Sequence, residues 1–320
     1  MPVDPEDIKR AVSAVVNDCL QVKEGEEVLV VCNPATLGLG ERLRGEAGRA
    51  GAEAVLALMA ERITHAAEPP ASIAAAMKAA DVVLAPTVQS LSHTASRKAA
   101  SEAGARIATL PGVTEEMLAR VMSADMAELR RKGGAVADLL TSSDSAHLTC
   151  PNGTDLHIGL GDRVAIPDAG ELGHERAFGN LPCGEGFIAP IEGSVEGTLV
   201  IDGTLAGVGM PSEPVVMKVV DGRLAEASGE EGAAFLGLLT PHGEEATTVA
   251  ELGIGTNEKA ELTGNILEDE KILGTVHIAF GAGAAIGGTI QVPVHLDCVV
   301  MKPTIEVGGT TVVSEGVFQL

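Results

Sequence analysis

The sequence predicts an α/β N-terminal domain, in which a parallel sheet carries helices on both faces, followed by a β-rich α+β domain. The first observation behind this prediction is that, through residues 1–145, short apolar runs alternate with stretches whose apolar residues have helical spacing. The second is that residues 146–320 change to closely spaced β-like runs with few helical stretches. A chain of 320 residues is long enough for two such domains, and we place them at 1–145 and 146–320.

The N-terminal domain begins with a predicted helix over residues 5–22, for which Asp4 is placed as the cap and Pro5 occupies the first turn. A compact apolar run, residues 27–33, then predicts a buried strand. The same two patterns repeat along the chain. They predict helices over 40–50, 71–80 and 92–103 and strands over 54–60, 81–87 and 105–112. Strands separated by helices favour a parallel sheet with right-handed crossovers.

The second domain begins with a predicted hairpin over residues 146–161, because Asn152-Gly153 is a strong turn signal between two β-like runs. Further β-like runs extend toward the C-terminus, and helical stretches interrupt them near 229–239 and 266–273. The glycine-rich segment 281–288 has GxGxxxG spacing and precedes a β-like run. It therefore does not meet the requirements of a dinucleotide-binding loop.

Composition argues against several classes of function. The net charge of −23, from 22 Lys and Arg against 45 Asp and Glu, would repel phosphate backbones, and an aromatic content of 2% leaves few rings for base stacking. Nucleic acid is therefore not an expected partner. No apolar run reaches the roughly 18 residues of a membrane span, so no membrane association is expected either. The five cysteines are scattered without a CxxC pair and the N-terminus is polar, which together favour reduced thiols and a cytoplasmic location.

Two histidines and an aspartate in the second domain form a candidate metal site. His295 and Asp297 are two residues apart in a β-like run, so both project from one face of the strand. An imidazole beside a carboxylate is a natural chelating pair, and His277 on a neighbouring β-like run could supply a third ligand. The alternative is that His277 is a core histidine and that His295 and Asp297 are a polar pair. The hypothesis makes residues 146–320 a metal-binding domain.

Several carboxylates lie close to these runs. Glu185 and Glu251 stand in apolar, glycine-rich segments, where a carboxylate is costly unless it is paired or binds a cation. A solvated surface position is the alternative for both residues. Glu268 and Asp269 precede the His277 run and are expected to be solvated charges at a helix end.

Four segments of the second domain resemble a known superfamily: NLPCGEGFIAP, VAELGIGTN, LTGNILEDEKILGTVHIAFG and VPVHLDCVVMKPTIEV. They are similar to segments of the thermophilic metallo-aminopeptidases (aminopeptidase T and S, leucyl aminopeptidase) and equally to the related 2,5-dihydroxypyridine 5,6-dioxygenases. HAAEPP, AAAMKAADVVLAPT and SLSHTASRKA extend the resemblance into the first domain. The resemblance thus covers most of the chain.

The peptidase resemblance implies an aminopeptidase-like hydrolase in which a metal-activated water attacks a peptide or amide carbonyl. The implied ligands of two Zn, Co or Mn ions are Glu185, Glu251, His277, His295 and Asp297, with Glu270 as a sixth, and Glu251 would also shuttle protons. This sequence departs from the peptidase pattern in two ways. Ile272 occupies the position of a peptidase glutamate, and the chain has no tyrosine to stabilise a tetrahedral intermediate. His93 or His174 would have to take the place of that tyrosine.

The dioxygenase resemblance is the alternative. It implies one Fe(II) held by His277, His295 and Asp297, with Glu185, His93 and His174 lining the substrate pocket. A dihydroxylated heteroaromatic ring would bind the iron directly, so no tyrosine is required. A catalytically silent small-molecule binder is a third possibility. The sequence thus predicts a hydrolase first and a dioxygenase second, with a small molecule or short peptide as substrate and, by the resemblance, a homo-oligomeric assembly.

Overall fold

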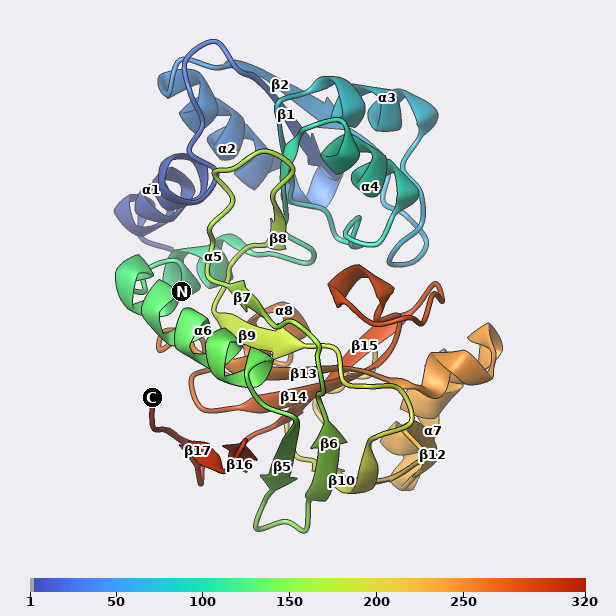
Figure 1. Ribbon diagram of the computed structural model, residues 1–320. Coiled ribbons are helices and arrows are strands. Elements are labelled where there is room, and N and C mark those ends of the chain that lie inside the picture. The colour runs from blue at the N-terminus through green and yellow to red at the C-terminus, as the bar shows by residue number, and fades with distance from the viewer. Residues whose placement is uncertain (1–2) are drawn as a thin grey trace. The chain divides into compact units, whose positions relative to one another are not determined.

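The computed structural model describes residues 3–320, which divide into two compact units (Figure 1). Unit 1 comprises the chain as far as Asp125 together with Gly170–Cys183, and unit 2 comprises Met126–Ala169 and Gly184–Leu320. These bounds differ from a single division between residues 145 and 146. Helix α6 (Met126–Thr141) packs on strands of unit 2, whereas Gly170–Cys183 returns to add a strand to unit 1.

Unit 1 is a parallel sheet of five strands in the order β2-β1-β3-β4-β8, and each pair of neighbouring strands is parallel. Its elements in chain order are α1 (Pro5–Ser13), the π-helix η1 (Ala14–Cys19), β1 (Glu27–Cys32), the 3-10 turn η2 (Pro34–Thr36), α2 (Leu37–Arg49), β2 (Glu53–Leu58), α3 (Ala71–Ala79), β3 (Val82–Ala85), α4 (Ala95–Glu102), β4 (Arg106–Thr109), α5 (Glu115–Val121) and β8 (Phe178–Asn180).

Helices cover both faces of this sheet, as predicted. On one face, Val31 and Val83 pack into a cluster with Met77 of α3 and Ala100 of α4. On the opposite face, α2 lies so close that a Cβ on Gly40 would come within 3.1 Å of Cys32 Sγ. The predicted α/β class of the N-terminal domain is therefore confirmed. The first predicted helix, 5–22, differs in detail because it changes from α to π geometry after Ser13.

A buried ion pair ties β4 of unit 1 to the segment that precedes β1. The Arg106 guanidinium donates to both Glu26 carboxylate oxygens, at 2.9 and 2.7 Å, and its Nε donates to Leu20 O at 3.0 Å. Burial alone would raise the pKa of Glu26, but hydrogen bonds from Arg106 and from the Lys23 N–H outweigh it and hold the pKa below its usual range. The stabilisation is therefore present above the unfolded-state pKa and is lost as the pH falls through the folded-state pKa.

We expect Glu26→Gln to lower the free energy of unfolding at pH 7 by about 3 kcal/mol, because Arg106 is left buried without its charge partner. The difference from the wild type should shrink as the pH falls through the lowered pKa of folded Glu26, because below it Glu26 is protonated in both states of the wild type. Urea unfolding at the two pH values measures both effects. Glu128→Gln, which breaks a solvent-exposed pair with Arg131, is the control and should change stability by less than about 0.5 kcal/mol. A difference that stays constant with pH would contradict the role of the Glu26 charge.

Unit 2 contains two sheets with strand orders β12-β11-β10-β6-β5-β16-β17-β18 and β15-β14-β13-β9-β7. Its elements in chain order are α6 (Met126–Thr141), β5 (Ser145–Thr149), β6 (Asp155–Gly159), β7 (Ile166–Asp168), β9 (Glu185–Ile188), β10 (Glu196–Ile201), β11 (Val215–Val220), β12 (Arg223–Ala227), α7 (Gly229–Leu239), the 3-10 turns η3 (Thr240–His242) and η4 (Glu244–Thr247), β13 (Val249–Gly255), α8 (Ile266–Asp269), β14 (Val276–Gly281), the 3-10 turn η5 (Ala284–Ile286), β15 (His295–Val300), β16 (Thr304–Val307), β17 (Thr310–Ser314) and β18 (Val317–Phe318).

A largely aliphatic core lies in unit 2 and draws on strands of both sheets, which confirms the β-rich α+β class. Its aromatic members include Phe235 and Phe280, whose rings meet edge to face at 6.1 Å. The predicted hairpin is present as β5 and β6, and Gly153 in its turn has φ +103°. The helical stretch predicted over 266–273 is shorter, since α8 ends at Asp269.

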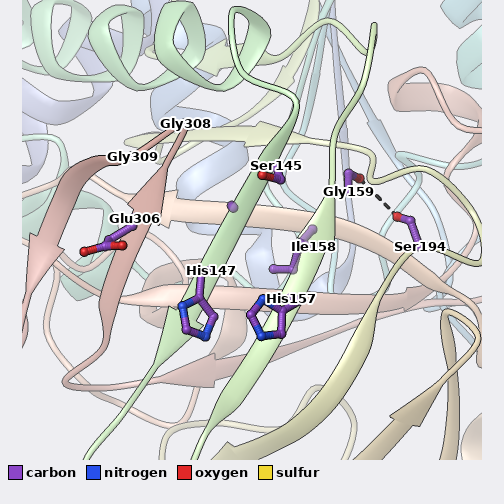
Figure 2. Close-up of a pocket in the computed structure, with 10 residues that line it drawn as sticks. Ser145, His147, His157, Ile158, Gly159, Ser194, Glu306, Gly308 and Gly309 are labelled. Atoms are coloured by element: carbon purple, nitrogen blue, oxygen red, sulfur yellow. Dashed lines mark hydrogen bonds between the residues drawn. The ribbon is translucent and has the colours of Figure 1, made fainter.

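The hairpin carries a group of polar residues on one face. His147 and His157 face each other across β5 and β6 with stacked rings, 4.2 Å between centroids, beside a pocket of about 440 Å³ (Figure 2). His147 Nε2 lies 2.8 Å from Asp155 Oδ1. We call His147, Asp155 and His157 the hairpin group. Their donor atoms lie within 4.8 Å of one another, so they could hold an ion, but all three side chains are exposed or half-buried.

None of the helices described for residues 3–320 combines the length and the apolar composition that crossing a bilayer requires.

Candidate metal centre

The centre is built on the second sheet of unit 2, and all five of its strands contribute. Glu251 comes from the middle strand β13, His277 from β14, and His295 and Asp297 from the edge strand β15. On the other side of β13, Glu185 comes from β9 and Asp168 from β7. The pairing places Glu251 opposite Ala279 and Ala279 opposite Asp297, so a small side chain lies between two carboxylates on one face. Strand register therefore brings together residues that are far apart in the sequence.

The Glu251 carboxylate lies between the two imidazoles. Its Oε1 is 3.3 Å from His277 Nε2, and its Oε2 is 3.3 Å from His295 Nε2. His277 Nε2 is also 3.0 Å from Glu185 Oε2, and His295 Nε2 is 3.5 Å from Asp297 Oδ1. Glu185 and Glu251 are only 5% and 7% exposed, so the alternative of solvated surface carboxylates is excluded.

These contacts define two donor sets that share Glu251. One set is Glu185, Glu251 and His277, and the other is Glu251, His295 and Asp297; within each set the donor atoms lie within 4.8 Å of one another. The predicted triad of His277, His295 and Asp297 does not form a single set of this kind among residues 3–320, because Glu251 lies between the two histidines. The two imidazoles are nevertheless joined through one carboxylate.

The donor chemistry fits a divalent cation. Glu185 Oε2 is buried without a hydrogen-bond partner in the described part of the chain, although it lies close to His277 Nε2. Four carboxylate oxygens of three residues converge on two imidazole nitrogens, and a buried group of acceptors is costly unless a cation neutralises it. Imidazole with carboxylate is the donor mixture that Fe(II), Zn and Mn accept in proteins.

A backbone contact fixes the orientation of His295. Its Nδ1 lies 2.7 Å from the carbonyl oxygen of Ala282, and because a carbonyl can only accept, Nδ1 carries the proton. Nε2 is then the ring nitrogen that faces Glu251 and Asp297. Ala282 is itself held by a hydrogen bond from its N–H to Val294 O at 2.7 Å. This is the arrangement expected of a metal-binding histidine, whose second nitrogen donates to an oxygen outside the metal site.

The ionisation of these groups follows from their mutual contacts. Burial would lower the pKa of His277 and of His295, but their carboxylate neighbours, Glu185 for His277 and Asp297 for His295, raise both values well above the usual range. Burial would raise the pKa of Glu251, yet hydrogen bonds with the two histidines lower it to about 2. Without a metal, the centre therefore holds protons on its imidazoles, and a bound dication would replace that positive charge.

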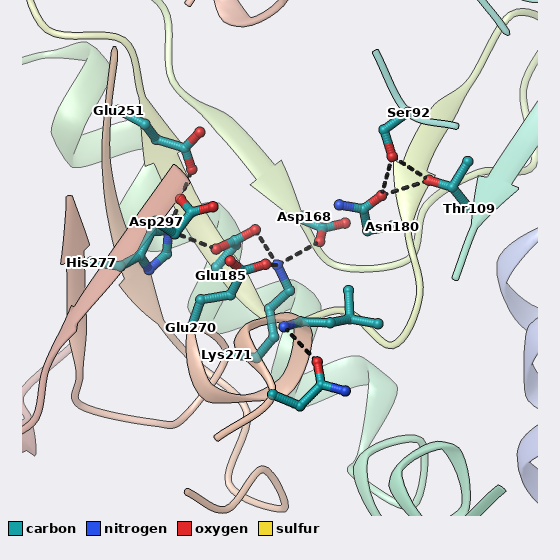
Figure 3. Close-up of polar contacts among 12 residues, drawn as sticks. Ser92, Thr109, Asp168, Asn180, Glu185, Glu251, Glu270, Lys271, His277 and Asp297 are labelled. Carbon is teal, nitrogen blue, oxygen red and sulfur yellow. Dashed lines mark hydrogen bonds and ion pairs between the residues drawn. The ribbon is translucent and has the colours of Figure 1, made fainter. Parts of the chain in front are cut away.

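A lysine completes the centre on the side of Glu185. Lys271 Nζ contacts Glu185 Oε1, lies 2.6 Å from Glu270 Oε1 and is 3.7 Å from Asp168 Oδ2 (Figure 3). Burial raises the pKa of Glu270 to about 8 and that of Asp168 to about 7, although Lys271 opposes both shifts. Glu270, expected as a sixth metal ligand, is thus paired with an ammonium group.

A glycine makes room for His277. Gly253 is the cross-strand partner of His277, and a Cβ at that position would lie 1.9 Å from His277 Nε2. The imidazole therefore rests directly on the β13 backbone. No side chain can replace the glycine hydrogen without displacing the ring.

Other predicted site residues lie elsewhere. His93 and His174 are exposed residues of unit 1, and their proposed contact with substrate stays a prediction. Glu268 and Asp269 were expected to be solvated, which is wrong because both are fully buried. They accept hydrogen bonds from backbone N–H groups of the preceding loop, Glu268 from Glu261 and Asp269 from Thr263 and Gly264.

Sequence reasoning missed three positions of this cluster: Lys271, Asp168 and Gly253. Lys271 stands in the run EDEK, which is typical of a solvated helix end. In the structure α8 ends at Asp269, before Lys271, and the Lys271 side chain is buried. Asp168 follows an irregular segment without a recognisable strand pattern. Gly253 could have been found, because it lies two residues after Glu251 on the same face of a fully buried strand, where a missing side chain indicates close approach.

Comparison with known proteins identifies the family. Residues 10–320 match the family model of 2,5-dihydroxypyridine 5,6-dioxygenase (NicX). A curated 2,5-dihydroxypyridine 5,6-dioxygenase from Pseudomonas putida is 26% identical over 238 residues, which cover 69% of this chain and 66% of that protein, slightly less than two thirds of its length.

Two solved structures share the fold. The 2,5-dihydroxypyridine dioxygenase of P. putida KT2440 superposes with a TM-score of 0.86 at 20% identity, covering 99% of this chain and 98% of that one. Wild-type AmpT from Thermus thermophilus superposes with a TM-score of 0.72, also at 20% identity, covering 98% and 99%. At 20% identity these two likenesses show the fold, and together with the family model and the curated relative they confirm the expected superfamily.

The comparisons correct the predicted order of functions. The aminopeptidase-like hydrolase, predicted first, is wrong, because the family model and the curated relative both name the dioxygenase. The peptidase likeness is one of fold at 20% identity. Because the family model spans residues 10–320, almost the whole chain, the chain belongs to the 2,5-dihydroxypyridine 5,6-dioxygenase family.

Proposed function

We propose that this protein is a mononuclear Fe(II) dioxygenase that opens the ring of 2,5-dihydroxypyridine or a closely similar dihydroxylated heteroaromatic compound. The observation that carries the proposal is the family match over residues 10–320, combined with a buried cluster of imidazoles and carboxylates in the matched region. The absence of tyrosine from the chain agrees with a substrate that binds the metal through its own hydroxyl oxygens.

His295 and Asp297 would hold the iron, and Glu251 or His277 would supply the third protein ligand. Glu251 belongs to the same compact donor set as His295 and Asp297, whereas His277 reaches them through Glu251. A bound Fe(II) would supply redox contact with O₂ and a Lewis-acid position for a substrate oxygen.

The chain's own residues would provide position and environment. The Ala282 carbonyl keeps the proton of His295 on Nδ1, so that Nε2 stays directed toward the metal position. Glu185 is held by Lys271 on one oxygen and presents the other to His277. Because Glu185, Lys271 and His277 are buried, water is largely excluded from their side of the donor cluster, and their mutual electrostatic interactions are strengthened.

The test is anaerobic loading of the metal-free protein with Fe(II), followed by addition of 2,5-dihydroxypyridine and O₂. We expect one iron per chain, consumption of O₂ that depends on the substrate, and a ring-opened product that carries both atoms of ¹⁸O₂. Protein loaded with Zn is the control and should be inactive, because Zn has no redox chemistry. Folded, iron-loaded protein that consumes no O₂ with this substrate or its dihydroxylated analogues would contradict the proposal and favour a silent binder.

A further inference from the structure

The ammonium group of Lys271 is among the most deeply buried charges described in unit 2. The residue has no exposed surface, whereas lysine is almost never fully buried unless it is paired. Three carboxylates surround its Nζ, those of Asp168, Glu185 and Glu270. Such an arrangement of buried carboxylates around a positive charge is what a protein also builds for a metal ion.

Backbone hydrogen bonds hold the main chain at Lys271. The Lys271 N–H donates to Glu268 O at 2.9 Å, and its carbonyl oxygen accepts from the Asn257 N–H at 2.8 Å. The next residue, Ile272, forms a parallel bridge with Asn257. The main chain at Lys271 is therefore held on both sides, and its Nζ is held by the three carboxylates.

Lys271 lies beside one donor set and not the other. Glu185, a member of the set with Glu251 and His277, contacts the ammonium through Oε1 and faces His277 through Oε2. The ion pairs of Glu251, His295 and Asp297 join these three residues to one another and to His277. A dication in the first set would therefore share its Glu185 ligand with a positive charge.

We propose that the Lys271 ammonium takes the place of a second divalent ion and so restricts this centre to one metal. The inference rests on the proposed function, since it explains how a fold with two overlapping donor sets serves a mononuclear enzyme. Lys271 is a positioning residue, because it acts through Glu185. Without its charge, Glu185, Glu251 and His277 become a second complete donor set for a dication.

The test counts Mn(II), which serves as probe because one ion and two coupled ions give different electron paramagnetic resonance spectra. We expect the wild type to bind one Mn(II) per chain with an uncoupled six-line spectrum. Lys271→Met should bind a second ion at least about 10²-fold more tightly than the wild type does and should show the spectrum of an exchange-coupled pair. Elemental analysis after gel filtration gives the stoichiometry independently.

Matched variants separate the charge of Lys271 from other effects. Glu270→Gln keeps the ammonium and should still bind one Mn(II). The double variant Lys271→Met with Glu270→Gln also replaces the carboxyl group that contacts the lysine, which guards against misfolding, and should bind two ions because Glu270 belongs to neither donor set. Lys132→Met removes a lysine that pairs with Glu258 and should leave the count at one. All titrations are repeated with His157→Ala, which removes weak binding at the hairpin group.

The possible outcomes test the role of Lys271 separately from the proposed function. Two Mn(II) ions in the wild type, or one ion in both folded Lys271 variants, would overturn the role of Lys271 whatever the protein catalyses. One ion in the wild type and a coupled pair in the Lys271 variants would support it, even if the iron-loaded protein failed to open a dihydroxypyridine ring. That second failure would contradict the proposed function alone.

Discussion

Replacement of His295 with alanine is expected to remove the iron of the proposed centre and to lower the proposed ring-opening activity by more than about 10²-fold. Residues that merely orient a metal ligand commonly cost 10–100-fold when they are changed, and a ligand should cost more. The loss should be large because His295 carries its proton on Nδ1, held by Ala282, and so offers Nε2 to the same space as Asp297 and Glu251. Iron per chain and O₂ consumption at saturating substrate measure the two effects.

His242→Ala is the control for this prediction. His242 is an exposed histidine of the same unit, in the turn η3, and its removal should leave both iron content and activity unchanged. Circular dichroism and gel filtration show whether His295→Ala keeps the native fold. A folded His295→Ala protein that retains one tightly bound iron would exclude His295 as a ligand.

A methyl group at position 253 is expected to damage the centre although it adds no polar atom. In Gly253→Ala the new Cβ would overlap the His277 ring, at 1.9 Å from Nε2 and 2.2 Å from Cε1. Overpacking of this kind costs about 1–3 kcal/mol, and the ring must rotate away from Glu185 and Glu251 to relieve it. We expect a loss of unfolding free energy in that range and an activity lowered by about 10–100-fold.

Gly237→Ala gives the matched comparison. Gly237 lies in α7, where a Cβ would meet no atom within 4 Å, so alanine there should raise stability by about 0.5–1 kcal/mol and leave activity unchanged. Urea unfolding of the metal-free proteins separates the packing effect from metal binding. Gly253→Ala with wild-type stability and wild-type iron content would show that the His277 ring does not depend on this clearance.

Much of the fold could be predicted because its signals are local. The parallel strands of unit 1 are short apolar runs, and the hairpin turn at Asn152-Gly153 is visible from two residues. Two helices were missed, α5 and α6. The start of α5 could have been predicted, because Thr114 is a typical helix cap followed by two glutamates, and it does accept from the Met117 N–H. In α6 the adjacent glycines Gly133 and Gly134 weaken the helical pattern.

The site was less predictable because register and burial decide it. That His295 and Asp297 share a face follows from their spacing, and it was foreseen. That Glu251 lies between His295 and His277 follows from the pairing of three strands, which spacing does not reveal. The burial of Lys271 depends on a single helical turn that ends two residues earlier. Sequence patterns identify candidate ligands, but they do not show which of these residues face one another in the folded protein.

The backbone bond from Ala282 to Val294 closes the connection between the two histidine-bearing strands right beside His295. The conformation of the residues between them, Gly283 to Pro293, therefore does not determine how the ligand side chains of the two strands are aligned. The length and sequence of that connection can change while the chelating groups keep their spacing. An insertion within β14 or β15, in contrast, would turn the side chains that follow it to the opposite face of the sheet.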